Sequence, residues 1–223
     1  YASGTQHICK ILMDDVIKTE PIYVESDSTQ MITDFFDLNG IIYIIKNKNS
    51  IYRIDDKTAN RQSLNLEKGE TIKFTFNHNN FSYIGTSSNR LFLFNGWQFK
   101  PITLRDKNYI NASYLNGGIS IDTNRFALST LIGGCLVVNS KTLETESFIN
   151  YSSGLPDDEV NSLGIDYNRG LWIAHGMGIS RVDLNVPVKS YEFYSGISGN
   201  ILSVAEYNRT LYVGGSEGLF NLM

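Results

Sequence analysis

The sequence predicts an all-β fold: a β-propeller of about five full four-stranded blades after a leading half blade, together part of a larger ring. Three observations lead to this prediction. A short hairpin that begins with an aromatic residue recurs along the chain. Its copies start about 40 to 46 residues apart, a spacing typical of propeller blades. No stretch sustains the 3.6-residue apolar spacing that a solenoid of helices would need. We therefore treat residues 1–223 as one propeller domain or fragment.

The recurring hairpin is clearest at residues 170–183. An apolar run begins at Leu171, the glycines around Met177 supply a turn where positive φ costs little, and an alternating run from Ile179 returns. Residues 211–222 and 1–11 repeat this pattern, and looser copies lie at 43–54, 83–94 and 126–138. The aromatic residues that lead the copies are Tyr1, Tyr43, Tyr83, Phe126, Trp172 and Tyr212.

Apolar runs and turn residues divide the first half of the chain into elements. Residues 1–11 form the outer hairpin of the incomplete blade, and residues 22–24 are a short strand that enters the next one. The strands expected in the following two blades are residues 32–36, 41–45, 51–54, 71–76, 81–85 and 90–94. We expect a polar connector over residues 57–70 and a blade junction at Trp97 and Phe99.

The second half follows the same order, and no helix is expected in it or elsewhere. The strands expected here are residues 110–115, 119–121, 126–130, 135–138, 160–165, 171–174 and 179–182. Residues 139–158 form the longest connector, with a further strand near Phe148 and Tyr151. The last blade begins with a strand over residues 201–205 and ends at Leu222.

Composition and charge exclude several classes of function. The net charge is −4 and no run of Lys and Arg exists, which argues against nucleic-acid binding. No apolar segment approaches the roughly 18 residues of a membrane span, so the fragment itself is expected to make no membrane contact. The chain begins with Tyr1 in mid-repeat, which predicts a piece of a longer protein that forms an arc because it cannot close a ring alone.

The two cysteines, Cys9 and Cys135, lie in repeats three positions apart. Blades that far apart hold their Cα atoms beyond the roughly 7 Å limit for a disulfide. We expect two free thiols, so cysteine usage does not identify the redox compartment.

With the repeats laid out, residues 154–179 resemble a two-component regulator propeller repeat. That pattern is Gly-Leu-Pro, a Val, an Asp, a short turn, then Gly-x-Leu-Trp-Ile-Gly-Thr and Gly-Leu, and it is matched here from Gly154-Leu155-Pro156 to Gly178-Ile179. Residues 199–220 are similar to another copy. The Gly-Thr of the family is Ala174-His175 here, Gly214-Gly215 in the last copy and Ile45-Lys46 in an early one.

The resemblance implies a sensor region of a bacterial signalling protein, such as a membrane-bound histidine kinase or hybrid two-component system. It implies a periplasmic or otherwise extracytoplasmic location as part of an inner-membrane protein, with the output module outside this fragment. The sensor would bind a small molecule, with carbohydrates among the candidates, or a partner, and a homodimer would form through the parent protein. The family has no universal catalytic residues, so the resemblance supplies none.

The strongest candidate ligand site is a row of Asn-Arg turns. Asn124-Arg125, Asn168-Arg169 and Asn208-Arg209 occur in three consecutive repeats, each after an acidic residue. We expect these turns to precede the third strand of each blade and to share a face with the blade-to-blade connectors. The guanidinium groups of Arg125, Arg169 and Arg209 could then bind an anionic sugar or carboxylate. The alternative is a left-handed Asn in each turn, with each Arg solvated or paired to its local acid.

Trp172 and His175 complete the candidate ligand-binding set with Asn168. Trp172 and its counterparts could stack on sugar rings, although one aromatic residue per blade is also what packing between sheets requires. His175 replaces a small hydroxyl residue at a strand end. His7, His78 and His175 lie in different repeats, so neither a metal site nor a catalytic triad is expected. No phosphate-binding loop or paired catalytic carboxylates occur, and no cofactor is expected.

These observations favour a non-enzymatic ligand sensor. Two other classes of function stay open. One is a protein-interaction propeller without a small ligand. The other is a propeller lyase or glycan hydrolase, which would need His, Tyr, Arg or carboxylate groups to converge in the central channel.

Overall fold

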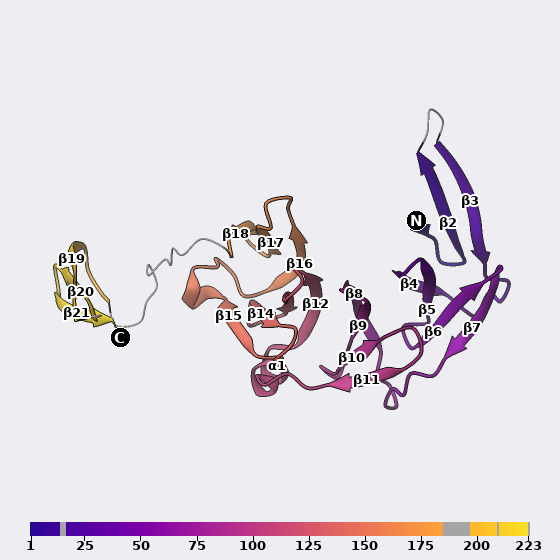
Figure 1. Cartoon of the computed structure of the whole chain (residues 1–223), viewed down its shortest axis with the longest axis horizontal. Helices are drawn as coiled ribbons and strands as arrows, with labels where there is room; N and C mark the ends of the chain where they lie inside the picture. The colour runs from indigo at the N-terminus through magenta and orange to yellow at the C-terminus, as the bar shows by residue number, and fades with distance from the viewer. Residues whose placement is uncertain (14–16, 185–196, 209, 223) are drawn as a thin grey trace.

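The computed structural model describes residues 1–13, 17–184, 197–208 and 210–222 as a succession of antiparallel sheets (Figure 1). Within each sheet the strands are hydrogen bonded in chain order. We number the sheets 1 to 6 along the chain. The all-β prediction is confirmed, and the arrangement is that of propeller blades, each built from one repeat.

Sheets 1 to 3 account for the first half of the chain. Sheet 1 contains β1 (Ala2–Ser3), β2 (His7–Met13) and β3 (Ile17–Val24). Sheet 2 contains β4 (Ile32–Leu38), β5 (Ile41–Lys46), β6 (Ser50–Asp55) and β7 (Thr58–Gln62). Sheet 3 contains β8 (Ile72–His78), β9 (Phe81–Thr86), β10 (Leu91–Phe94) and β11 (Phe99–Ile102).

Sheets 4 to 6 follow a short helix, α1 (Lys107–Ser113). Sheet 4 contains β12 (Leu115–Ser120), β13 (Arg125–Thr130), β14 (Cys135–Asn139) and β15 (Thr145–Ile149). After a 3-10 turn, η1 (Tyr151–Ser153), sheet 5 contains β16 (Val160–Ile165), β17 (Leu171–His175) and β18 (Gly178–Val182). Sheet 6 contains β19 (Ile201–Tyr207), β20 (Thr210–Gly215) and β21 (Gly218–Leu222).

In sheets 2 to 5 the first strand lies on the inner side of the arc. β4, β8, β12 and β16 contact one another in succession, while the later strands extend outward. Figure 1 shows sheets 1 to 5 following one another along an open arc. Since neighbouring strands run in opposite directions, the turn after each first strand lies at the end opposite to the connector that enters that strand.

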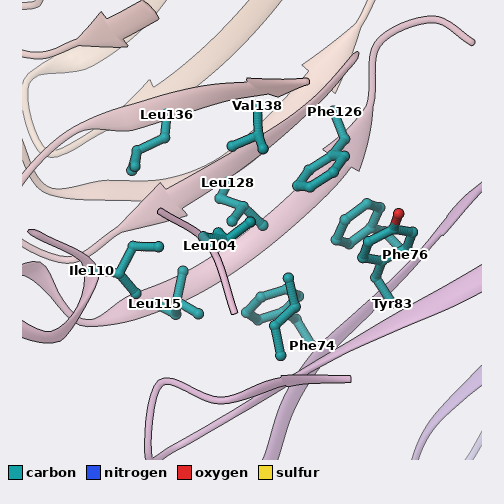
Figure 2. Close-up of a cluster of buried hydrophobic side chains, with 11 residues drawn as sticks. Phe74, Phe76, Tyr83, Leu104, Ile110, Leu115, Phe126, Leu128, Leu136 and Val138 are labelled. Atoms are coloured by element: carbon teal, nitrogen blue, oxygen red, sulfur yellow. The ribbon is translucent and has the colours of Figure 1, made fainter. Parts of the chain in front are cut away.

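Hydrophobic side chains fill the space between successive sheets from sheet 1 to sheet 5. β5 illustrates why its sequence is an unbroken apolar run: Ile42 and Ile44 pack toward sheet 1, whereas Tyr43 and Ile45 pack toward sheet 3. A strand buried on both faces loses the polar alternation of a surface strand. Figure 2 shows the cluster between sheets 3 and 4, where Phe76 and Tyr83 point toward Phe126 and Leu128. The Tyr83 and Phe126 ring centroids are 5.0 Å apart.

The structure corrects the register of the aromatic series. Tyr43, Tyr83 and Trp172 lie on the second strand of their sheets, not the third, and each is three residues before the strand's last residue. In β13 that position belongs to Ala127, which packs toward sheet 5. Phe126 is one residue out of step, so it points to the opposite face of its sheet and packs toward sheet 3.

Several predicted elements were wrong. Residues 110–115 were expected to be a strand, but most of them belong to α1, because Ile110 and Ser113 share the buried side of two helical turns. Residues 57–70 include strand β7, and residues 22–24 end the outer strand of sheet 1 instead of entering sheet 2. Phe99 packs on Phe94 at a centroid distance of 4.2 Å, whereas Trp97 is 85% exposed and joins no junction.

The number of strands also differs from the prediction. In the described residues, sheets 2 to 4 have four strands, and sheets 1, 5 and 6 have three. The strand predicted near Phe148 and Tyr151 is confirmed at Phe148 as β15, whereas Tyr151 lies in η1. None of the helices in the described ranges is long and apolar enough to cross a membrane.

Candidate ligand-binding surface

The Asn-Arg turns lie on a different face from the one predicted. Asn124-Arg125 connects β12 to β13, and Asn168-Arg169 connects β16 to β17, so both turns follow a first strand. They therefore lie at the end opposite to the blade-to-blade connectors. The expectation was wrong because it counted these strands as second and third. Arg209 lies outside the described residues, and its neighbour Asn208 has a positive φ of 49°.

Arg125 is held within its own turn. Its Nε donates to Asp122 Oδ2 at 2.8 Å, and Nη2 lies 2.7 Å from the same oxygen. The second oxygen of Asp122 accepts the backbone N–H groups of Asn124 and Arg125 at 2.9 and 3.0 Å. Burial alone would raise the pKa of Asp122, but these hydrogen bonds and the guanidinium charge lower it. Arg125 thus follows the local-pairing alternative.

Arg169 has a backbone role in its turn. Its φ is 62°, and its N–H donates to the carbonyl of Asp166 at 2.9 Å. The sequence placed Asn168 in the left-handed position, but Arg169 occupies it. Asn168 instead donates its N–H to Asp166 Oδ1 at 2.9 Å. The Arg169 side chain is exposed, so its role in binding an anion stays a prediction.

Asp166 organises an exposed aromatic and cationic cluster on sheet 5. Its Oδ2 accepts Trp172 Nε1 at 2.9 Å and Arg181 Nε at 2.7 Å, and Oδ1 accepts the Gly170 N–H at 2.8 Å. The Arg181 hydrogen bond is the main cause of a strongly lowered pKa for Asp166. Trp172 remains 41% exposed, and the neighbouring Tyr167 is fully exposed. An aromatic face with a fixed carboxylate and guanidinium is suited to stacking and hydrogen bonding with a sugar.

His78 and His175 lie in different sheets, each with its own partner. His175 is buried with Nε2 2.9 Å from Ser180 Oγ, and His78 is buried with Nδ1 2.9 Å from Ser120 Oγ. In the described part of the chain, the second ring nitrogen of each is buried without a hydrogen-bond partner. No group of three His, Cys, Asp or Glu residues that could hold a metal occurs in the described ranges.

Burial raises the pKa of the Cys135 thiol to about 12, which keeps it protonated.

Sequence reasoning missed a pocket beside α1. A cavity of about 330 Å³ lies between α1, the start of β12 and the outer strands of sheet 3. Its lining includes Leu91, Ile110 and Leu115 from the hydrophobic core and Lys107 and Asn111 from the exposed side of the helix. The signal was hidden because residues 110–115 look like one more strand of the repeat.

Comparisons with known proteins support the fold. No family model matches the sequence, and no curated protein matches it. Two structures of the extracellular domain of BT4673 from B. thetaiotaomicron, described as a one-component and as a hybrid two-component system, match with TM-scores of 0.58 and 0.59. Their sequence identities are 16% and 15%, and both cover 87% of this chain.

The extracellular domain of BT3049, described as a hybrid two-component system of the same organism, matches with a TM-score of 0.52 and 19% identity over 86% of this chain. The chain spans only 26 to 30% of the length of these three structures. The C-terminal WD40 domain of Sif2 matches with a TM-score of 0.52 and 15% identity over 93% of this chain. At such identities the comparisons establish the propeller fold, and the BT proteins are of the kind that the sequence resemblance predicted.

Proposed function

We propose that this chain is the ligand-sensing propeller of a bacterial signal-transduction protein and that it lies outside the cytoplasmic membrane. The observation that carries the proposal is the match to extracellular domains of two-component systems. The two-component regulator propeller pattern at residues 154–179 supports it independently. The chain spans under a third of the length of those extracellular domains, and an output module elsewhere in the protein is part of the proposal.

Sensing would depend on differential binding. A ligand that prefers one arrangement of the propeller and its neighbouring domains shifts the population toward that arrangement, and the shift reaches the output module. The Asp166–Trp172–Arg181 cluster supplies aromatic, anionic and cationic groups at the surface for recognition. No chemistry on the ligand is required for this role.

A thermal-shift screen of the purified chain tests the proposal. The panel would contain neutral oligosaccharides, acidic sugars and small organic acids. A ligand at a hundred times its Kd stabilises the folded state by about 2.7 kcal/mol, which should raise the Tm by about 5 to 10 °C. The same ligand should change the expression of genes controlled by the full-length protein in its host.

Other outcomes would contradict the sensor assignment. If no compound raises the Tm and a stable protein partner is recovered from the host, the interaction-propeller alternative is favoured. If a panel glycan is cleaved, and the cleavage products are seen by mass spectrometry, the chain is an enzyme.

A further inference from the structure

The pocket beside α1 has an apolar floor made of core residues. Leu91, Leu104, Ile110 and Leu115 all line it, and each is at most 6% exposed. These side chains belong to the cluster between sheets 3 and 4, and Figure 2 shows Leu104, Ile110 and Leu115 side by side at its edge. The volume of about 330 Å³ falls at the lower end of the range for small-molecule sites, roughly 300 to 1,000 Å³.

The helical wall of the pocket is fixed in place. The Tyr109 hydroxyl donates to the Gly133 carbonyl at 2.6 Å, and its ring packs on Phe148 at a centroid distance of 4.9 Å. The N–H groups of Leu131 and Ile132 donate to the Ser113 carbonyl at 3.0 and 3.3 Å. These contacts tie α1 to sheet 4, so the pocket is preformed and a ligand would not have to order it.

The rim of the pocket carries positive charge. Lys107 and Asn111 are four residues apart and lie on the same helix face as Ile110. The described residues offer Lys107 no ion pair. Arg90 also lines the pocket, but Glu70 and Glu67 already bind its guanidinium group. The lining contains no carboxylate, so Lys107 is the charge that an incoming ligand would meet.

We propose that this pocket binds a small organic anion with an apolar body, of the type of an aryl-alkyl or branched alkyl carboxylate. The apolar body would cover the leucine and isoleucine floor, and the carboxylate would accept hydrogen bonds from Lys107 Nζ and the Asn111 amide. An apolar cavity with few polar groups at one side is the usual composition of small-molecule sites. The pocket is a second ligand site in addition to the Asp166–Trp172–Arg181 cluster, and its biological meaning rests on the proposed sensing function.

Calorimetric titration of the purified chain with 3-phenylpropionate tests the proposal. The neutral 3-phenylpropanamide and acetate serve as probes that lack the charge or the apolar body. For a ligand of about eleven non-hydrogen atoms we expect saturable binding of 3-phenylpropionate with a Kd on the order of 1 mM. The amide should bind about fivefold more weakly, and acetate should show no saturation.

Two exposed substitutions locate the binding site. Lys107→Gln should weaken 3-phenylpropionate binding about fivefold and leave amide binding unchanged. Asn111→Trp should abolish both by filling the cavity. Lys141→Gln, which removes an exposed lysine away from the pocket, is the matched control and should bind as the unmodified chain does. Circular dichroism verifies that each variant is folded.

The possible outcomes separate this proposal from the sensing function. No saturation with 3-phenylpropionate, or undiminished binding by Asn111→Trp, would overturn the pocket assignment. Equal affinities for acid and amide would overturn the anion preference. Saturable binding of 3-phenylpropionate here without any response of the full-length protein would overturn sensing through this pocket and leave the binding site itself intact. A response of the full-length protein to a ligand bound elsewhere, together with no saturation by 3-phenylpropionate, would overturn the pocket and leave the sensing function intact.

Discussion

A buried ion pair joins Lys46 of sheet 2 to Glu25 at the end of sheet 1. Both side chains are 7% exposed. The Tyr23 hydroxyl donates to Glu25 at 2.7 Å, and Lys46 Nζ lies 4.3 Å from the centroid of the Tyr52 ring. Burial alone would raise the pKa of Glu25, but the hydrogen bonds from Lys46, the Asp27 N–H and Tyr23 lower it to about 2. The pair holds one end of the sheet 1–sheet 2 interface.

Removing one partner of this pair should lower the free energy of unfolding far more than replacing both partners with apolar residues. Lys46→Met leaves a buried carboxylate without its cation, and we expect the free energy of unfolding to fall by about 3 to 5 kcal/mol. The double variant Glu25→Leu/Lys46→Met should recover most of that loss. Urea unfolding measures both, with exposed Lys48→Met as control. A double variant no more stable than Lys46→Met would show that the packing of the alkyl chain, and not charge, dominates.

His78 should make stability depend on pH. Burial lowers its pKa, and the nearby Asp122 only partly opposes this. Since the unfolded chain then binds a proton more readily, the contribution is complete above the ordinary pKa of about 6.5 and is lost as the pH falls through the lower folded-state value. We expect the Tm of the chain to fall between pH 7 and pH 5 more steeply than that of His78→Gln. Parallel curves would exclude His78 as the cause.

For the site residues, the sequence predicted the motif but not the partners or the exposure of its side chains. The acid before each Asn-Arg pair was visible, but whether Arg125 pairs with Asp122 or faces solvent depends on geometry that spacing does not encode. At the Asp166 turn the same motif behaves differently, because Arg181 on another strand binds the acid and leaves Arg169 exposed. The exposure of Trp172 could not be predicted either, since its counterpart Tyr43 is fully buried.

Among the elements, the turn between β13 and β14 depends on one glycine. Gly134 has a φ of 71°, and a Cβ there would lie 2.2 Å from the Ile149 carbonyl oxygen. Gly154, after η1, has a φ of 100° with nothing within 4 Å of a Cβ. The two positions share the left-handed backbone and differ only in the space for a side chain.

Alanine at these two glycines should therefore have unequal effects. Gly154→Ala incurs only the conformational penalty, about 1 to 2 kcal/mol. Gly134→Ala adds a backbone clash that forces β14 away from β15, and we expect a loss of at least about 3 kcal/mol. Thermal unfolding followed by circular dichroism measures both. Equal losses would show that the β13–β14 turn can shift to accommodate a methyl group.

The second strands of sheets 2 to 4 were predictable because each is buried on both faces and is an unbroken apolar or small-residue run. The central strands of sheets 2 to 4 were placed to within a few residues for this reason. β7 was missed because its sequence is polar. It is the outer strand of sheet 2, and its pairing with β6, not an apolar pattern, makes it a strand. α1 was missed because two helical turns carry too few residues to establish a 3.6-residue period.

At the scale of the whole molecule, stability comes from contacts between neighbouring sheets, and within sheets 1 to 5 each neighbouring pair shares one hydrophobic cluster. Sheets 2 and 3 share a cluster in which Phe94 is fully buried and packs against Tyr43 at a centroid distance of 5.1 Å. Unfolding in such arrays is local, because a sheet loses support only from the sheets beside it.

Phe94→Ala should destabilise one part of the arc. Loss of the ring removes about 3 to 5 kcal/mol of packing between sheets 2 and 3. We expect faster amide hydrogen exchange in β4–β10 and nearly unchanged exchange in β13–β17. Exchange measured by mass spectrometry would reveal the pattern. A uniform acceleration across all sheets would mean that the described chain unfolds as one cooperative unit.

Repetition gives a propeller many near-identical places around its circumference, which is a poor basis for selectivity. The helix α1 before sheet 4 makes these places distinguishable, because it gives one blade a structure that the other described blades lack. Substitutions on the exposed side of this connector can change which ligand the molecule recognises, while the hydrophobic clusters between neighbouring blades stay unchanged. Specificity and architecture would then be free to evolve at separate rates.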